Sequence, residues 1–355
     1  MKHRTWSIAG IGGLAVLLGG YTAYWLIAAG TVGERVDAWA DEHRAAGYEI
    51  AFAERDVGGF PFRFEVLITK PNVTNVPKGW HWEAESLTLS ARPWNLHHIG
   101  VSFPGRHDIS LYTGDAWFDF TCLIKEAAGE LSVFGDGQVR EFHSEIRDVA
   151  YSRPGVDFFG SLDALSIDGR RFDDADPDYR TPSAEMRLSV SQALVPEDAS
   201  WVLHKHPIDF ALTAQVTGPL PNGDAPVASL TRWRDAGGVI EVDRMGLFWG
   251  PIEVETTGTL TLDEAMRPLG AFTADIIGHG DIIDLLAAND FVSLGEATLY
   301  KLGFALLARP RVEGGPPVLS VPITMQDGEL KLGPVTIDQI PPVVPSPVPA
   351  NEAGS

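Results

Sequence analysis

A strict alternation in residues 252–262 constrains the fold of this chain more than any other stretch. The segment reads IEVETTGTLTL, so isoleucine, valine and leucine all fall on one parity and the glutamates fall on the other. A period of two residues is typical of a half-buried antiparallel strand, which turns one face to a core and the other to water. The segment is therefore predicted to be a strand of a sheet with one wet face.

Two further β-rich runs flank this strand and complete a meander. Residues 239–249 precede it, and Gly250-Pro251 supplies the turn, because proline presets φ at a turn corner. The apolar parity changes within the first run, which predicts a bulge near Asp243–Arg244. Residues 269–277 follow as a third strand. This order predicts an antiparallel β-meander, which describes architecture rather than chemistry.

Strand-like segments continue through the rest of the chain. In residues 60–66, Phe60, Phe62 and Phe64 share one parity after a Gly-Gly pair, which predicts a strand with three aromatic side chains on one face. Residues 280–308 instead carry apolar residues at helical spacing and predict a helix pair. The expected fold class is mainly β: a long, curled or meandering antiparallel sheet with a few helices, namely an N-terminal membrane anchor and stalk and a C-terminal helix pair.

The N-terminus carries the clearest topological signal. Lys2 and Arg4 are followed by no charged residue before Glu34, and residues 5–30 are long and apolar enough to cross a bilayer core, which needs about 20 residues. A cleavable signal peptide is the alternative, but its apolar region would be shorter. We expect an uncleaved, single-pass anchor in the bacterial inner membrane. Its basic end stays in the cytoplasm, which places the C-terminal domain in the periplasm.

Composition limits the partners that the chain can have. Its 355 residues hold 27 Lys and Arg against 48 Asp and Glu, so nucleic acid and anionic headgroups are not expected to bind an acidic surface that repels phosphate. The inner membrane, reached through one helix, and a lipid are the expected partners. Ala15, Gly19 and Ala23 form a row of small residues in the anchor, which leaves a homodimer through this helix as an open alternative. The single Cys122 lies in an apolar run and is predicted to be an inert, buried thiol.

Composition also predicts how the chain is divided. Residues 1–4 are the cytoplasmic N-terminus, 5–30 the transmembrane anchor and 31–47 a stalk helix that ends at a glycine. An N-terminal β-rich region covers 48–220, and a C-terminal meander with its helix pair covers 227–340. The Pro- and Asn-Gly-containing stretch between them reads as a linker. Residues 341–355 are a Pro-rich tail that is expected to be disordered.

No residue pattern selects a catalytic or metal site. The acidic loop 174–185 has the carboxylate spacing of a calcium loop, but Tyr179 stands where that loop needs glycine. His97-His98 and His204-Lys205-His206 lack the spacing of a zinc site such as HExxH. The sequence shows neither a G-x-S-x-G elbow nor a phosphate-binding loop. We therefore expect no enzyme, no catalytic residue, no metal and no cofactor.

Four segments in a fixed order carry a family resemblance: GGFPFRFEV, ARPWNLHHIGVSFPGRH, FWGPIEVETTGTLTLDEAMRPLGAFT and DGELKLGPVTIDQIPP. Through them the sequence resembles the proteobacterial family known as domain of unknown function 2125, over nearly the whole chain after the anchor. More loosely it resembles the AsmA-like envelope proteins. That looser resemblance implies an AsmA-like fold, in which one inner-membrane helix precedes a periplasmic β-rich region with an apolar surface for lipids. It also implies a role in lipid handling or outer-membrane homeostasis, and neither resemblance implies catalytic residues.

Two functions follow from these expectations. The first is a membrane-anchored periplasmic protein of the cell envelope whose apolar sheet face or groove binds acyl chains. Its candidate lining residues are Phe60, Phe62, Phe64, Trp249, Leu260 and Leu262. The second is a scaffolding or assembly partner of other envelope proteins, with a closed core and no ligand, because most aromatic stripes fill an ordinary core.

Overall fold

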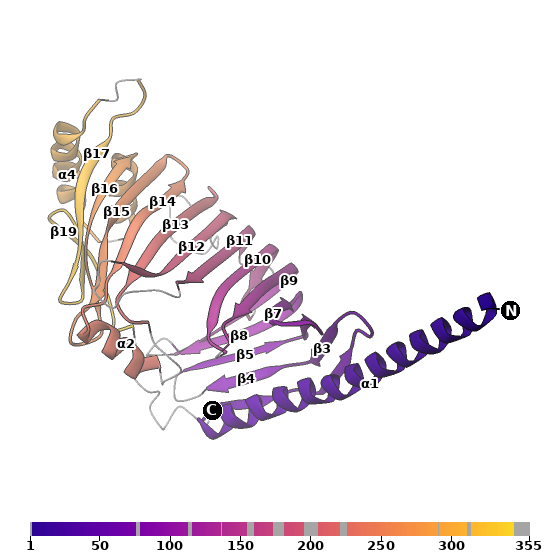
Figure 1. Ribbon diagram of the computed structural model, residues 1–355. Coiled ribbons are helices and arrows are strands. Elements are labelled where there is room, and N and C mark those ends of the chain that lie inside the picture. The colour runs from indigo at the N-terminus through magenta and orange to yellow at the C-terminus, as the bar shows by residue number, and fades with distance from the viewer. Residues whose placement is uncertain are drawn as a thin grey trace.

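One continuous sheet accounts for most of this protein, as the computed structural model shows (Figure 1). Within the described residues, the strands form a single antiparallel sheet of 19 strands, and the helices are four. The structure describes the chain except residues 1, 76–78, 113–115, 136, 155–159, 173–180, 195–204, 221–225, 290, 311–313 and 344–355, and except the side chains of residues 2–17, 226 and 227.

The strands are longest in the middle of the chain. The first eight are β1 (Glu49–Ala51), β2 (Glu54–Gly58), β3 (Phe64–Thr69), β4 (Asn72–Asn75), β5 (Trp80–Ala84), β6 (Ser86–Arg92), β7 (Asn95–Ser102) and β8 (Gly105–Tyr112). Longer strands follow as β9 (Trp117–Val133), β10 (Val139–Ser152), β11 (Gly160–Arg171), β12 (Pro182–Ala193), β13 (Ile208–Thr217), β14 (Ile240–Trp249), β15 (Ile252–Leu262) and β16 (Pro268–Ile277). The last strands are β17 (Leu319–Gln326), β18 (Glu329–Leu332) and β19 (Val335–Gln339), and the helices are α1 (Lys2–Ala45), α2 (Pro226–Asp235), α3 (His279–Ala288) and α4 (Leu294–Leu307).

The strands run as one up-and-down meander. From β9 to β19 each strand pairs with the next along the chain. The first eight strands form two parallel courses of the same meander. In one, β3 pairs with β6 and β6 with β7. In the other, β4 pairs with β5 and β5 with β8. The first half of β9 pairs with β8 and its second half with β7. Each pair β1–β2, β3–β4, β5–β6 and β7–β8 therefore acts as one long strand that turns a corner.

The corners of neighbouring strands line up into a crease across the sheet. Backbone hydrogen bonds continue through it, from the Lys70 N–H to the Glu85 carbonyl at 3.0 Å and from the Phe103 N–H to the Ala127 carbonyl at 3.1 Å. In β10 the crease passes through Asp148, which has a φ of 52° and drops out of the ladder while its neighbours stay paired. The sheet thus folds along a line without losing its pairing.

Helices pack against the sheet near its two ends. The Trp25 ring of α1 stacks on Phe64 of β3 with a centroid distance of 5.4 Å, and Ala29 joins the same cluster. At the other end, α3 and α4 bury Ile283 and Phe304 in one cluster with residues of β16 and β17. The Trp233 indole of α2 is buried and donates a hydrogen bond to the Thr217 carbonyl at the end of β13.

The predicted meander is confirmed in its strands, turn and bulge. Strands β14, β15 and β16 cover the three predicted runs, and Trp249 pairs with Ile252 across the Gly250-Pro251 turn. The register of β14 against β15 shifts between Val242 and Met245, which is where the apolar parity changes. The predicted helix pair is also present as α3 and α4.

The predicted strand over residues 60–66 is wrong at its start. Strand β3 begins only at Phe64, because Gly59 has a φ of 93° and the Arg63 N–H donates to the Gly59 carbonyl, which closes a turn. The Phe60-Pro61 peptide lies in that turn and is cis. Phe60 and Phe62 therefore do not share a strand face with Phe64.

The predicted division near residues 219–226 does not interrupt the sheet. Strands β13 and β14, on either side of it, pair from Ile208 to Val216. Most of the predicted calcium-like loop, His204 and the predicted tail from residue 344 lie outside the described residues.

The described part of the chain contains no helix that is both long enough and apolar enough to span a membrane. Helix α1 runs unbroken over Lys2–Ala45, and Gly47 follows it with a φ of 90°, as predicted for the end of the stalk. The side chains of residues 2–17 lie outside the description, so the anchor predicted over residues 5–30 stays a prediction.

Candidate functional site

Cross-strand pairing places one apolar row across the sheet from β9 to β17. Residues that pair directly across neighbouring strands point to the same face. The row consists of Ala127, Ile146, Leu165, Val190, Phe210, Leu247, Val254, Ile276 and Leu319. From β11 onwards, a second row on the same side consists of Ile167, Leu188, Leu212, Met245, Thr256, Ala274 and Val321. These rows define what we call the apolar face.

The opposite side of the same strands is polar. There the paired residues are Glu130, His143, Asp168, Arg187, Thr213 and Arg244. His143 Nδ1 lies 2.6 Å from Asp168 Oδ1 across β10 and β11, with both side chains exposed. The polar side can face water. The apolar face is the side that an antiparallel sheet normally packs against other parts of a protein or a partner.

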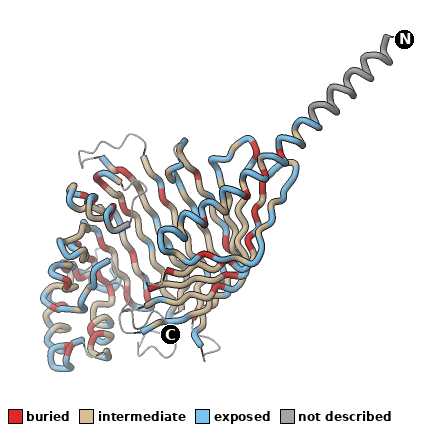
Figure 2. Tube along the Cα trace, turned by 90° about the horizontal axis from the view of Figure 1, so that it is seen from below, coloured by how far each residue is buried: buried red, intermediate tan, exposed pale blue. Residues whose placement is uncertain are grey.

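The apolar face is covered at its two ends and open between them. Phe64 is 1% exposed beneath Trp25, and Leu319 is 1% exposed beneath the helix pair. By contrast, Ile146, Leu165 and the other row members on β10 to β13 stay partly exposed. Figure 2 shows the strands in the middle of the sheet mostly in the colour of intermediate burial. With about 4.8 Å between neighbouring strands, the open part from β10 to β13 spans roughly 14 Å.

A cavity of about 470 Å³ deepens the apolar face at the crease. Trp82 of β5 and Leu87 of β6 lie on opposite sides of the crease and both line it, which shows that the two halves of the face converge there. Its full lining is Trp82, Leu87, Phe103, His107, Ile109, Cys122, Ile124, Ile146, Val149, Leu162 and Leu165. Because Ile146 and Leu165 also belong to the first apolar row, the cavity opens onto that row.

The polar groups of this cavity are already satisfied within the protein. The Trp82 indole can only donate, so its 3.1 Å contact makes His107 Nδ1 an acceptor and leaves the proton on Nε2. His107 Nε2 then donates to the Phe103 carbonyl at 2.7 Å. Burial raises the pKa of the Cys122 thiol, and the Asp108 carboxylate raises it further, so the reactive thiolate is disfavoured. The cavity is thus lined mainly by apolar side chains, and the histidine among them is hydrogen-bonded within the protein.

The structure separates the six residues that the sequence suggested for the groove. Leu260 and Leu262 have the parity of the apolar face and are half-buried. Trp249 is buried in a cluster with Ile252 and residues of α3, and its indole donates to the His206 carbonyl. Phe64 is sealed under α1, whereas Phe60 and Phe62 are exposed in the turn before β3.

The central residues of the apolar face were missed by sequence reasoning. Residues 141–147 read EFHSEIR and alternate like the meander, with Phe142 and Ile146 on one parity. That signal predicts a two-faced strand but gives no partner, so it could not show that Ile146 stands opposite Leu165.

The match to known proteins is at the level of one family. A family model described as an uncharacterized protein conserved in bacteria, DUF2125, matches residues 25–341. The chain therefore belongs to the DUF2125 family, as its sequence segments suggested. No curated protein and no solved structure matches the chain.

Proposed function

We propose that this member of the DUF2125 family is a membrane-anchored envelope protein of bacteria that binds lipid acyl chains along its apolar face. The observation that carries the proposal is the open middle of that face, flanked by helices at both ends. Soluble proteins rarely leave an apolar surface of this extent in water unless it meets a ligand, a partner or a membrane. A long, narrow apolar strip with a deeper cavity at one point suits the hydrocarbon chain of a lipid.

The distribution of polar groups supports this ligand class. The cavity at the crease offers no unpaired polar side chain, because both nitrogens of His107 are hydrogen-bonded within the protein. A sugar or peptide would leave its own polar groups without partners there, which is costly in an apolar site. An acyl chain has no such groups. The looser resemblance to AsmA-like proteins likewise implies an apolar surface that holds lipids.

The anchor in this proposal is the part of α1 that precedes Trp25, where the buried cluster of the helix with β3 begins. Trp25 and Ala29 pack against β3, so they face protein rather than lipid. Residues 5–24 remain for the span, and at 1.5 Å per residue they would measure roughly 30 Å, the thickness of a hydrocarbon core. The sheet would then stand in the periplasm, directly beside the inner membrane.

A charge on the open part of the apolar face tests the proposal. Leu165→Asp places a carboxylate in the crease cavity, whereas Ser166→Asp changes the next residue, which points to the polar face. We expect native mass spectrometry of the detergent-purified full chain to detect bound lipid in the wild type and in Ser166→Asp, but at least about tenfold less in Leu165→Asp, because hydrocarbon next to a carboxylate prevents its hydration.

The melting temperature of both variants is measured alongside and should stay close to that of the wild type. The reason is that position 165 is partly exposed, so without bound lipid its carboxylate can stay hydrated without unfolding the sheet. Equal lipid content in both variants, or none in the wild type, would refute acyl-chain binding along this face.

A second candidate function, a scaffold for another envelope protein, is favoured by one feature of α4. Leu299, Leu302 and Leu306 lie at i, i+3 and i+7 and are all exposed, so they form a leucine stripe on the outside of the helix. Such a stripe suits the groove or helix of a protein partner.

Charging that stripe tests the scaffold. We expect Leu302→Glu with Leu306→Glu to lower the mass of the complex on native gels of solubilised membranes, while Thr336→Glu, exposed on β19 and outside the stripe, leaves it unchanged. The same complex mass for all three proteins would argue against the scaffold.

A further inference from the structure

Three side chains of α1 fasten two turns of the sheet to the end of the apolar N-terminal run. Tyr21 Oη donates to the Pro61 carbonyl, and Trp25 Nε1 donates to the Arg63 carbonyl at 3.2 Å. Tyr24 Oη donates to the Pro93 carbonyl at 3.0 Å. The turns before β3 and between β6 and β7 therefore lie at a fixed place on the helix, beside the last turn of the segment proposed to cross the membrane.

Both turns expose large apolar side chains at this place. Phe62 is 70% exposed and Trp94 is 65% exposed, and Phe60 and Leu96 are also exposed. The Phe60 ring packs edge-on against Trp25 of α1 with a centroid distance of 5.3 Å, whereas Phe62 and Trp94 stay largely uncovered within the described residues. In membrane proteins, exposed aromatic side chains such as tryptophan are enriched at the interface between the hydrocarbon core and water.

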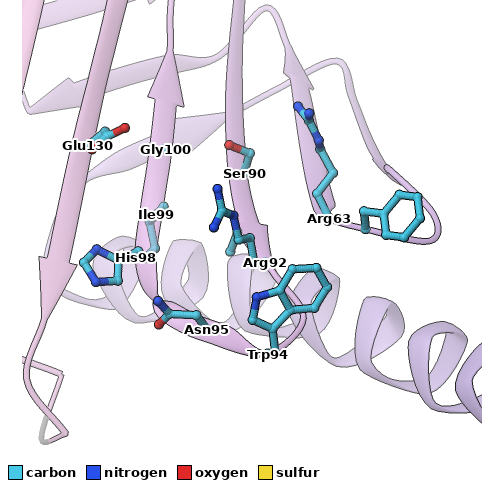
Figure 3. A pocket seen from close by; sticks show the side chains of 11 residues that line it. Arg63, Ser90, Arg92, Trp94, Asn95, His98, Ile99, Gly100 and Glu130 are labelled. Atoms are coloured by element: carbon cyan, nitrogen blue, oxygen red, sulfur yellow. The ribbon is translucent and has the colours of Figure 1, made fainter.

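A pocket of about 690 Å³ lies between the two turns on the polar face. Its lining includes Arg63, Arg92, Trp94, His98 and Glu130 (Figure 3). In Figure 3 the Arg92 side chain extends into the pocket and Trp94 lies at its edge, with α1 behind.

The charges around this pocket have opposite signs and are not neutralised by one another. Among the described residues, Arg92 has no ion-pair partner, and Arg63 has only Glu65, at 3.7 Å. Glu130 brings a carboxylate to the same pocket. A guanidinium binds phosphate through several N–H donors, and a carboxylate accepts hydrogen bonds from an ammonium group. The pocket thus matches a headgroup that carries both a phosphate and a primary ammonium.

We infer that these two turns form a bilayer-docking surface, on which Phe62 and Trp94 enter the interface while Arg92 binds the phosphate of a zwitterionic, ethanolamine-type phospholipid. The net charge of −21 disfavours an anionic headgroup, which leaves the zwitterionic one as the better match. This inference rests on the proposed anchor. It adds that the apolar face is held at a fixed height and angle above the leaflet, with β3 and α1 nearest to the lipid.

A fluorescent probe at Phe62 tests the contact with the bilayer. The full chain is prepared with Cys122→Ala and Phe62→Cys, labelled, and reconstituted in phosphatidylethanolamine-rich nanodiscs with a lipid that carries a spin label near its headgroup. The control carries the label at Thr336→Cys, an exposed position on β19 at the far end of the sheet. We expect the spin label to quench the Phe62 probe at least about twofold more than the Thr336 probe.

The phosphate contact is tested by adding Arg92→Glu to the Phe62 probe protein. We expect the quenching to fall by about half, because the substitution places a carboxylate against a phosphate. Arg309→Glu, an exposed arginine far from the pocket, should leave the quenching unchanged. A fall that is as large in phosphatidylcholine nanodiscs would remove the role given to the ammonium group and to Glu130.

The outcomes separate this inference from the proposal on which it rests. A full chain that fails to float with vesicles would overturn the anchor, and this inference with it. A chain that floats but shows equal quenching at Phe62 and Thr336, or no response to Arg92→Glu, overturns the docking surface alone. The lipid content measured for Leu165→Asp reports on the apolar face and is independent of both results.

Discussion

Phe64→Asp is expected to unfold the N-terminal part of the sheet. The Phe64 ring is 1% exposed and stacks on Trp25 of α1 at 5.4 Å, so the substitution both removes a buried aromatic and leaves a carboxylate without a partner. Loss of a buried phenylalanine alone costs about 3–5 kcal/mol, and the buried charge adds to this. The sum reaches the lower range of total domain stability, about 5–15 kcal/mol. Circular dichroism during thermal unfolding would show the loss of the cooperative transition.

Phe62→Asp is the matched control for this prediction. Phe62 is the same residue type only two positions away, but it is 70% exposed in the turn before β3. Its substitution should change the free energy of unfolding by less than about 0.5 kcal/mol, since it leaves no group buried and unpaired. Similar melting curves for both variants would mean that α1 does not seal β3 in solution.

Local alternation was enough to predict the architecture of the C-terminal meander. Residues 252–262 repeat every two positions, and this period alone predicts a strand with one wet face, which the structure places as β15. The parity change before Met245 likewise predicted the bulge, because a bulge is a change of phase along one strand. Both features are encoded within about ten residues.

Features that depend on distant partners could not be predicted in this way. The same alternation in β10 and β15 gave no register, so the continuity from Ile146 to Leu247 across the sheet was invisible. Phe60, Phe62 and Phe64 share a parity but not a face, because the Gly59 turn breaks the strand that parity assumes. The open part of the apolar face was unpredictable as well, since it depends on which strands α1, α3 and α4 pack against rather than on the strands themselves.

Ile283→Asp is expected to detach the helix pair and expose the far end of the apolar face. Ile283 of α3 is fully buried in one cluster with Ile276 and Leu319, and truncation of such an isoleucine costs about 2–5 kcal/mol before the charge is counted. Leu306→Asp on α4 is the control, because Leu306 is 87% exposed and should be neutral in stability.

Hydrogen exchange would show the difference: in Ile283→Asp the amides of β16 and β17 should exchange faster, while those of β10 and β11 keep their protection. The reason is that each strand of a meander is stabilised mainly by its neighbours and by whatever covers its apolar side. If protection is lost along the whole sheet instead, the helices stabilise the entire fold, and the open middle of the apolar face cannot be treated as independent of them.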